Sequence, residues 1–391
     1  MAFQYLSTLN KEQKMPFRSK VGPSFEEPVV DTPTQGEMWV TGDAQSTGTL
    51  GLGNTTDYSS PVQLGSSTNW KEHFGGKKVN FAIGGGKLFG WGEGHYGYSG
   101  HNNTTDYSSP VQIGALTTWE MGNAGRRVAL AIRTDGKMYA WGSPNYGALG
   151  TGSGSAVSSP TLVLGGKSDW DFVAADTDWV GGIDDSGRLF TWGRGTYGAI
   201  GNGATDNVTS PVQIGSSTDW VKLQAAGGMT GIRSTGAGNG TLFTWGSGQS
   251  GRNGRGDTTN VSSPVQVGSL TDWKSIVGGG DWMGALKHDG TMWGWGNSIM
   301  TGGNGGGSSP VQIGTDTNWE SISMGYSQNT LARKTNGKLY VWGRGTAGCL
   351  GTGATANVAA PVQIGVLTTW KSFTRMSQHA QASAMFIKEA S

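Results

Sequence analysis

The chain repeats itself seven times, and this repetition limits its fold more than any other feature. A segment of the form S-S-P-V-Q-I-G, closed by a tryptophan about four residues later, returns along the whole chain. Its prolines are Pro61, Pro110, Pro160, Pro211, Pro264, Pro310 and Pro361, spaced 46 to 53 residues apart. Repeats of this length are typical of arrays in which each unit buries its apolar face against its neighbours.

A second motif accompanies the first and reads K-L-F-G-W-G or a close variant. Its copies follow turn sequences such as T-D-G or H-D-G and end in a W-G tryptophan at Trp91, Trp141, Trp192, Trp245, Trp295 and Trp342. Alternation of apolar and other residues between turns indicates β-strands. Each copy precedes a glycine-rich stretch that we expect to be a long, ordered loop. Four short strands per unit favour a propeller blade over an open β-solenoid, whose repeats are usually about half as long.

The composition agrees with a folded core. The 70 glycines and only 14% charged residues could indicate disorder, but 17 tryptophans do not. All but Trp179 and Trp282 occupy fixed positions in the two motifs, so we interpret them as packing residues. The predicted fold is all-β, a seven-bladed β-propeller of four-stranded antiparallel blades.

The two ends of the chain together supply one blade. The chain stops where another W-G strand would begin, and T-Q-G-E-M-W-V-T-G at 34–42 provides that strand, with Thr41 in place of the tryptophan. We predict that this N-terminal strand joins the C-terminal blade and closes the ring, which hides open sheet edges. Residues 34–391 then form the propeller. Residues 1–33, with four prolines and no blade motif, form an extended N-terminal arm, for which a disordered tail is the alternative.

The units resemble the repeats of the regulator of chromosome condensation family. The resemblance is carried by I-R-T-D-G-K-M-Y-A-W-G-S-P-N-Y-G-A-L-G-T-G at 132–152 and L-K-H-D-G-T-M-W-G-W-G-N at 286–297, and it extends over about residues 34–391. It implies the propeller fold. Members of the family include exchange factors for small GTPases and inhibitors of β-lactamase, but the family's histidine before the second strand is missing here. The P-V-Q-I-G version resembles bacterial and bacteriophage members, particularly virion-associated ones.

No motif predicts catalysis, a cofactor or a metal site. The five histidines lack metal-ligand spacing, and G-R-G-T-Y-G at 193–198 lacks the helix that would bind a phosphate. The single cysteine, Cys349, excludes an internal disulfide and a cysteine-based metal cluster. A net charge of +1 gives no reason to expect nucleic acid. Without an apolar run for a signal peptide or a membrane helix, we expect no membrane insertion and folding in a reducing cytoplasm.

The residues that vary most between units lie in the loop before the second strand. In the resemblance these loops line one face of the ring, and variable loops on a rigid scaffold are common binding sites. The candidate binding face consists of Lys77, Arg126, Asp176, Trp179, Asp281, Trp282 and Tyr326. Trp179 and Trp282 matter most, because aromatic residues are enriched at interface hot spots. The alternative is that both fill gaps in their own blades.

These features predict a non-enzymatic structural or decoration protein of a bacteriophage particle, made in the host cytoplasm and placed on the capsid, collar or tail. Its partners would be other virion or assembly proteins, contacted through residues 1–33 and one propeller face. A soluble adhesin or inhibitor that binds a host-surface protein or glycan is one alternative. A GTPase exchange factor is another.

Overall fold

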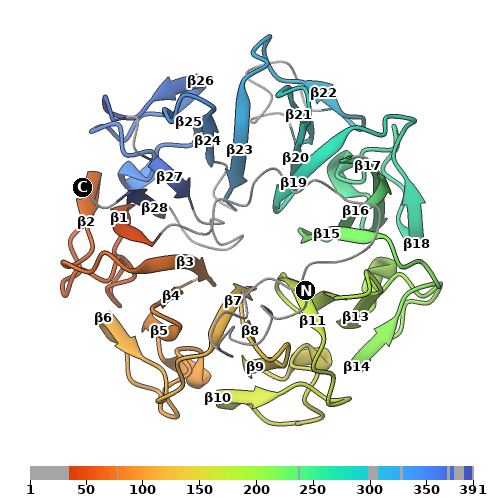
Figure 1. Cartoon of the computed structure of the whole chain (residues 1–391), viewed down its shortest axis with the longest axis horizontal. Coiled ribbons are helices and arrows are strands. Elements are labelled where there is room, and N and C mark those ends of the chain that lie inside the picture. The colour runs from red at the N-terminus through yellow and green to blue at the C-terminus, as the bar shows by residue number, and fades with distance from the viewer. Residues whose placement is uncertain are drawn as a thin grey trace, which may run out of the picture.

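The computed structural model describes residues 35–76, 78–236, 238–297, 307–325, 329–367, 370–373 and 383–389. Its antiparallel four-stranded blades stand in a ring around a central axis, so the chain is an all-β propeller (Figure 1). Helical structure in the described part consists of three-residue 3-10 turns inside the glycine-rich stretches, which the sequence predicted as loops throughout. These turns are η1 (His95–Gly97), η2 (Asn145–Gly147), η3 (Thr196–Gly198), η4 (Gln249–Gly251) and η6 (Thr346–Gly348).

Each blade repeats one order of strands from the centre to the rim. The first blade contains β3 (Trp70–Gly75), β4 (Val79–Gly84), β5 (Lys87–Gly92) and β6 (Tyr107–Gln112). The next two contain β7 (Trp119–Ala124), β8 (Val128–Arg133), β9 (Met138–Gly142) and β10 (Val157–Leu162), then β11 (Trp170–Ala175), β12 (Trp179–Asp184), β13 (Leu189–Gly193) and β14 (Val208–Gln213). Figure 1 shows the first strand of each blade near the centre and the fourth at the rim.

Three further blades continue this order. They contain β15 (Trp220–Ala225), β16 (Gly228–Gly236), β17 (Asn239–Gly246) and β18 (Val261–Gln266), then β19 (Trp273–Gly279), β20 (Trp282–Lys287), β21 (Met292–Gly296) and β22 (Val311–Gln312), then β23 (Trp319–Met324), β24 (Asn329–Lys334), β25 (Leu339–Gly343) and β26 (Val358–Gln363). In these six blades the third strand carries the W-G motif, and the fourth carries the repeated proline, except that Pro310 lies just before β22.

Strands from the two ends of the chain pair with each other. β1 (Gly36–Gly42) is antiparallel to β28 (Ser383–Glu389) over seven residue pairs, and β28 pairs in turn with β27 (Trp370–Phe373). On its other side β1 pairs with β2 (Tyr58–Gln63). We call β27, β28, β1 and β2 the terminal blade. A single pairing of Gly36 with Trp70 joins it to β3, so eight strands share one sheet. The predicted arm, residues 1–33, lies outside the described residues.

The W-G tryptophans bind neighbouring blades together. All six are at most 1% exposed. In five of them the indole N–H donates to a backbone carbonyl in the glycine-rich loop of the preceding blade, over 2.8 to 3.2 Å. The buried ring supplies a large apolar area, and the hydrogen bond removes the cost of burying its polar N–H. The predicted role of these tryptophans in packing is therefore confirmed.

Candidate protein-binding face

Two sets of loops lie on one face of the ring. In every blade the last residue of the third strand pairs with the first residue of the second strand, as Gly92 does with Val79. The loop before the second strand and the glycine-rich loop after the third strand therefore lie together. The Glu93 N–H donates to the Lys78 carbonyl over 2.8 Å and links the two loops directly. We call this the glycine-loop face.

Two residues predicted for this face are buried and act in packing. Trp282 is 2% exposed and packs in a core cluster with Leu286 and Trp319, so the prediction that it is a contact residue is wrong. Asp176 is 4% exposed, and its carboxylate accepts a hydrogen bond from the Gly227 N–H of the next blade over 2.7 Å. Asp176 therefore joins two blades and is not free to meet a partner.

The other predicted residues divide into four groups. Trp179 is half-buried and packs against the core beside it. Asp281 is held by Arg252, whose guanidinium lies 2.6 Å from its carboxylate and also donates to the Gly280 carbonyl over 3.2 Å. Arg126 is half-buried on the glycine-loop face. Lys77 and Tyr326 lie outside the described residues.

Three tyrosines stand out on this face. Tyr96, Tyr146 and Tyr197 occupy the middle position of the 3-10 turns η1, η2 and η3 and are 57%, 43% and 58% exposed. Their φ angles of 54°, 55° and 62° fall in the left-handed region, which non-glycine residues adopt at a cost of about 1 kcal/mol or more. Three consecutive blades thus present an exposed aromatic ring from the same strained position.

The fold does not require tyrosine at this position. Ser250 in η4 and Ala347 in η6 take the same left-handed conformation, with φ of 60° and 55°. A small side chain is therefore sufficient to form the turn. Large apolar rings that are exposed and unnecessary for folding are typical of contact surfaces.

An arginine lies over one of these tyrosines, and another lies nearby on the same face. The Arg194 guanidinium lies 4.7 Å from the centre of the Tyr146 ring and 3.8 Å from the Asp178 carboxylate. Burial raises the pKa of Asp178, while the nearby positive charges of Arg127 and Arg194 lower it. Burial likewise raises the pKa of the Tyr98 phenol, and the positive charge of Arg127 offsets part of that rise. Arg127 therefore lies within electrostatic range of both the first and the third blade.

Exposed rings beside charged groups give this face the chemistry of a binding surface. Among the residues that the structure describes, no group of three or more His, Cys, Asp or Glu side chains could hold a metal ion. His73 is buried against Asn80, with 3.2 Å between the ring nitrogen and the amide oxygen. In the described ranges, no helix is long and apolar enough to cross a membrane.

The tyrosines were missed at the level of sequence, although a signal was present. They occur as H-Y-G, N-Y-G and T-Y-G at one register of the repeat, where other units have Q-S-G and T-A-G. A comparison of the repeats at this one position shows that the repeat accepts serine or alanine there, so the tyrosines are not needed for the turn.

Comparison with known proteins supports the repeat assignment. Residues 135–175, 186–231, 239–286 and 336–384 match the family model for the regulator of chromosome condensation (RCC1) repeat. The ultraviolet-B receptor UVR8 of Arabidopsis thaliana is 29% identical over 204 residues, which are 50% of this chain and 46% of the receptor. The E3 ubiquitin-protein ligase HERC2 of Homo sapiens is 30% identical over 127 residues, 32% of this chain and 3% of the ligase. The chain spans less than half the length of either relative.

A solved structure gives the same fold. Prp20p from Saccharomyces cerevisiae, described together with its binding properties to Gsp1p and histones, superposes with a TM-score of 0.75 at 17% identity. The match covers 90% of this chain and 91% of that one. The chain therefore carries RCC1 repeats and has the fold of RCC1-like propellers. These relatives are eukaryotic, and they do not test the predicted resemblance to bacteriophage members.

Proposed function

We propose that the chain is a non-enzymatic propeller that binds a partner protein on its glycine-loop face, over the first three blades. The observation that carries the proposal is the set of exposed, left-handed tyrosines at one position of consecutive repeats. Tyrosine offers a large, rigid contact area at a low cost in side-chain entropy and is enriched at interface hot spots. Arg126, Arg127 and Arg194 add positive charge, so the expected partner surface is apolar and acidic.

This proposal includes a ring of seven blades. We count the eight-stranded sheet as two blades, the terminal blade and the blade β3–β6, because only one residue pair connects them. The seven residue pairs between β1 and β28 support closure of the ring by the two chain ends. A closed ring would hold the three tyrosines at fixed separations, which favours a rigid partner surface.

The test compares two faces of the ring. A variant with Tyr96→Ala, Tyr146→Ala and Tyr197→Ala should fold normally, because Ala347 already occupies the equivalent position in η6. Its matched control, Leu116→Ala with Leu164→Ala and Leu270→Ala, removes exposed apolar side chains from loops on the opposite face. Quantitative capture from the native source, read by mass spectrometry, should lose a specific partner by at least about tenfold for the tyrosine variant alone. Equal capture by both variants would contradict the proposal.

We further propose that the partner is a component of a bacteriophage particle. The P-V-Q-I-G style of the repeat and the proline-containing residues 1–33 support this location. Mass spectrometry of purified particles should detect the chain at structural copy number. Repeated failure to detect it in intact particles would exclude the virion role and leave the protein-binding face unaffected.

A GTPase exchange factor is the second candidate. The likeness in fold to Prp20p favours it, and the missing histidine before the second strand counts against it. A nucleotide-release assay with a small GTPase distinguishes this activity from simple binding. An adhesin or inhibitor would instead bind a host-surface protein or glycan as an isolated monomer.

A further inference from the structure

A cation lies over aromatic rings at one end of six of the blades. The fourth blade shows the arrangement, in which Trp220, at the start of the first strand, packs edge-to-face against Phe243 of the third strand at 5.5 Å. Arg233 pairs with Trp220 from the second strand, and its guanidinium lies 5.7 Å from the Trp220 ring centre and 5.1 Å from the Phe243 ring centre. At this distance a cation is attracted by the negative face of an aromatic ring.

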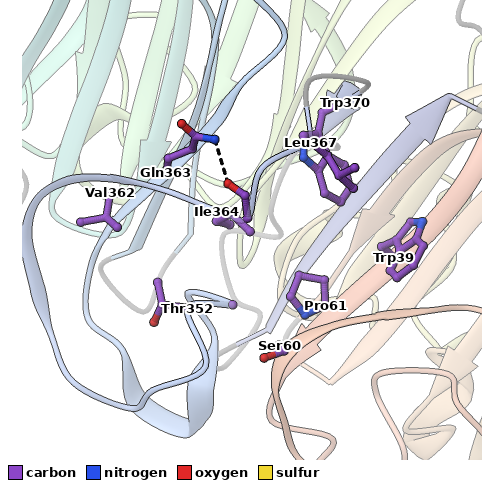
Figure 2. Close-up of a pocket in the computed structure, with 11 residues that line it drawn as sticks. Trp39, Ser60, Pro61, Thr352, Val362, Gln363, Ile364, Leu367 and Trp370 are labelled. Atoms are coloured by element: carbon purple, nitrogen blue, oxygen red, sulfur yellow. Dashed lines mark hydrogen bonds between the residues drawn. The ribbon is translucent and has the colours of Figure 1, made fainter.

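These cations lie at the opposite end of each blade from the glycine-loop face. Each is 4.5 to 5.9 Å from the nearest ring centre of its blade, and they are Arg133, Lys167, Arg233, Lys287, Lys334 and Lys388. In the terminal blade the ring under Lys388 is Trp39, which also borders a cavity of about 460 Å³ beside β26 (Figure 2). The fold therefore does not close off a ring at this position.

The first blade has the rings and lacks the cation. Trp70 and Phe89 lie 5.1 Å apart in the same edge-to-face geometry. The residue that pairs with Trp70 is Gly84, so no side chain reaches over the rings from the second strand. The loop position from which Lys167 reaches the rings of the third blade is Ser67 here. Among the described residues, no lysine or arginine lies over the Trp70 or Phe89 ring.

The space beside these rings is accessible from solvent. A Cβ added to Gly84 would lie 3.1 Å from Cε3 of Trp70, so a side chain here would run directly along the ring. A Cβ added to the exposed Gly85 would meet only the Asn69 Nδ2 within 4 Å, at 3.2 Å. Phe89 is half-buried, so part of its ring faces solvent. A group from outside the chain can therefore approach the rings past the two glycines.

The residue before Trp70 offers a neutral oxygen to an incoming cation. This residue is Asn69, whose side-chain oxygen accepts a hydrogen bond from the Ser67 hydroxyl over 2.6 Å. In the second blade Thr118 holds the same place, and its hydroxyl oxygen accepts a hydrogen bond from the Arg133 Nε–H over 2.9 Å. The four lysines instead lie within 3.4 Å of a carboxylate, which belongs to Asp169, Asp272, Asp316 or Glu37. A neutral oxygen beside a ring suits a guanidinium better than an ammonium, because the guanidinium is more weakly hydrated and stacks on aromatic faces.

We propose that Trp70 and Phe89 form a contact site for an arginine side chain of a partner protein. The guanidinium lies over the Phe89 ring, as that of Arg233 lies over Phe243, and donates a hydrogen bond to the Asn69 side-chain oxygen. The partner surface at this site is therefore basic, whereas the one expected at the glycine-loop face is acidic. The two sites lie at opposite ends of the blade, so failure of this one would leave the proposed function unchanged.

The experiment follows the phenylalanine rings of the full chain by carbon-13 NMR. The chain has 11 phenylalanines, and the Phe89 signal is the one that disappears in Phe89→Leu. Titration with an N-acetylated, C-amidated glycine-arginine-glycine peptide should shift this signal, with saturation in the millimolar range. The same peptide with citrulline has the shape of arginine without its charge and should leave the signal unchanged. Gly84→Arg supplies the cation from the chain itself and should abolish the response to the arginine peptide.

The fourth blade provides the matched control. Its Phe243 signal should not respond in the unchanged chain, and Arg233→Gly should make it respond by uncovering the same pair of ring types. The test holds even if Gly84→Arg does not fold, because the citrulline comparison and Arg233→Gly leave Gly84 intact. Absence of a shift of the Phe89 signal at up to about 20 mM peptide, where a millimolar site is nearly saturated, would overturn the proposal. Equal shifts with the arginine and citrulline peptides would also overturn it.

Discussion

The Trp192 junction and the terminal junction join neighbouring blades by different means. Trp192 is fully buried, donates its indole N–H to the Ala148 carbonyl over 2.9 Å and lies 6.1 Å from the Trp170 ring. At the terminal junction the buried Thr41 supplies only a hydroxyl and a methyl group. The Thr41 hydroxyl lies within hydrogen-bonding distance of the Tyr58 carbonyl of its own blade and of the Gly348 carbonyl of the neighbouring blade, at 2.7 and 3.2 Å. A large apolar ring therefore holds the regular junction, and a short polar side chain takes its place at the terminal one.

Removing the central side chain should therefore harm the two junctions unequally. Trp192→Ala deletes a fully buried ring and leaves a large void, which we expect to cost about 3–5 kcal/mol in the free energy of unfolding. Thr41→Ala removes one hydroxyl with two hydrogen bonds, and about 1 kcal/mol is expected. Urea titration of both variants, with the fold checked by circular dichroism, measures the difference. Equal losses would show that the comparison is wrong.

The junction on the other side of the terminal blade contains a buried polar group. The Thr49 carbonyl accepts hydrogen bonds from the Trp91 indole and from the Asn80 amide, over 2.9 and 2.7 Å. His73 lies against Asn80 and close to the Trp91 ring, with 6.0 Å between the ring centres. Burial lowers the pKa of His73 to about 4, so its imidazole is neutral in the folded chain at pH 7.

This histidine should make the junction sensitive to acid. In the unfolded chain His73 takes up a proton below about pH 6.5, while in the folded chain it does so only near pH 4. Its contribution to stability is thus fully present above pH 6.5 and is lost as the pH falls from there to about 4, by about 3 kcal/mol in total. His73→Gln should remove this part of the pH dependence. We would compare urea titrations of both chains at a series of pH values, and parallel curves would contradict the assignment.

The regular part of this architecture could be predicted from the sequence, because each tryptophan and proline recurs at a fixed register. The places where a blade departs from this pattern are visible only in the folded structure. The second strands β8, β20 and β24 end in an arginine or lysine that lies over an aromatic ring of the blade, and Arg233 within β16 does the same. The third blade has Asp184 at that position, and Lys167 from a preceding loop supplies the cation, 4.7 Å from the Phe190 ring. Such compensation between distant residues leaves no trace in the repeat pattern.

The candidate face was harder to predict for a related reason. A tryptophan outside the register can fill a gap or face solvent, and the local sequence is the same in both cases. Trp282 turned out to be buried, whereas the exposed rings belong to tyrosines held in left-handed turns. The exposure of these tyrosines depends on a left-handed backbone conformation that tyrosine disfavours. Conformational propensity alone would therefore not predict a tyrosine ring at this position.

The smallest difference in the free energy of unfolding should come from alanine substitutions at two equivalent glycines, which differ in the atoms that surround them. Gly150 and Gly351 have nearly the same φ, 63° and 66°, so alanine is strained equally at both positions, by about 1 kcal/mol. At Gly150 the new Cβ would also lie 2.7 Å from the Trp192 indole nitrogen, whereas at Gly351 its nearest neighbours are at 3.4 Å. Gly150→Ala should thus cost about 1–3 kcal/mol more than Gly351→Ala, because the indole must move. Thermal unfolding of the two variants measures this difference, and adding Thr41→Trp to Gly351→Ala should abolish it by giving the terminal junction the ring that it lacks.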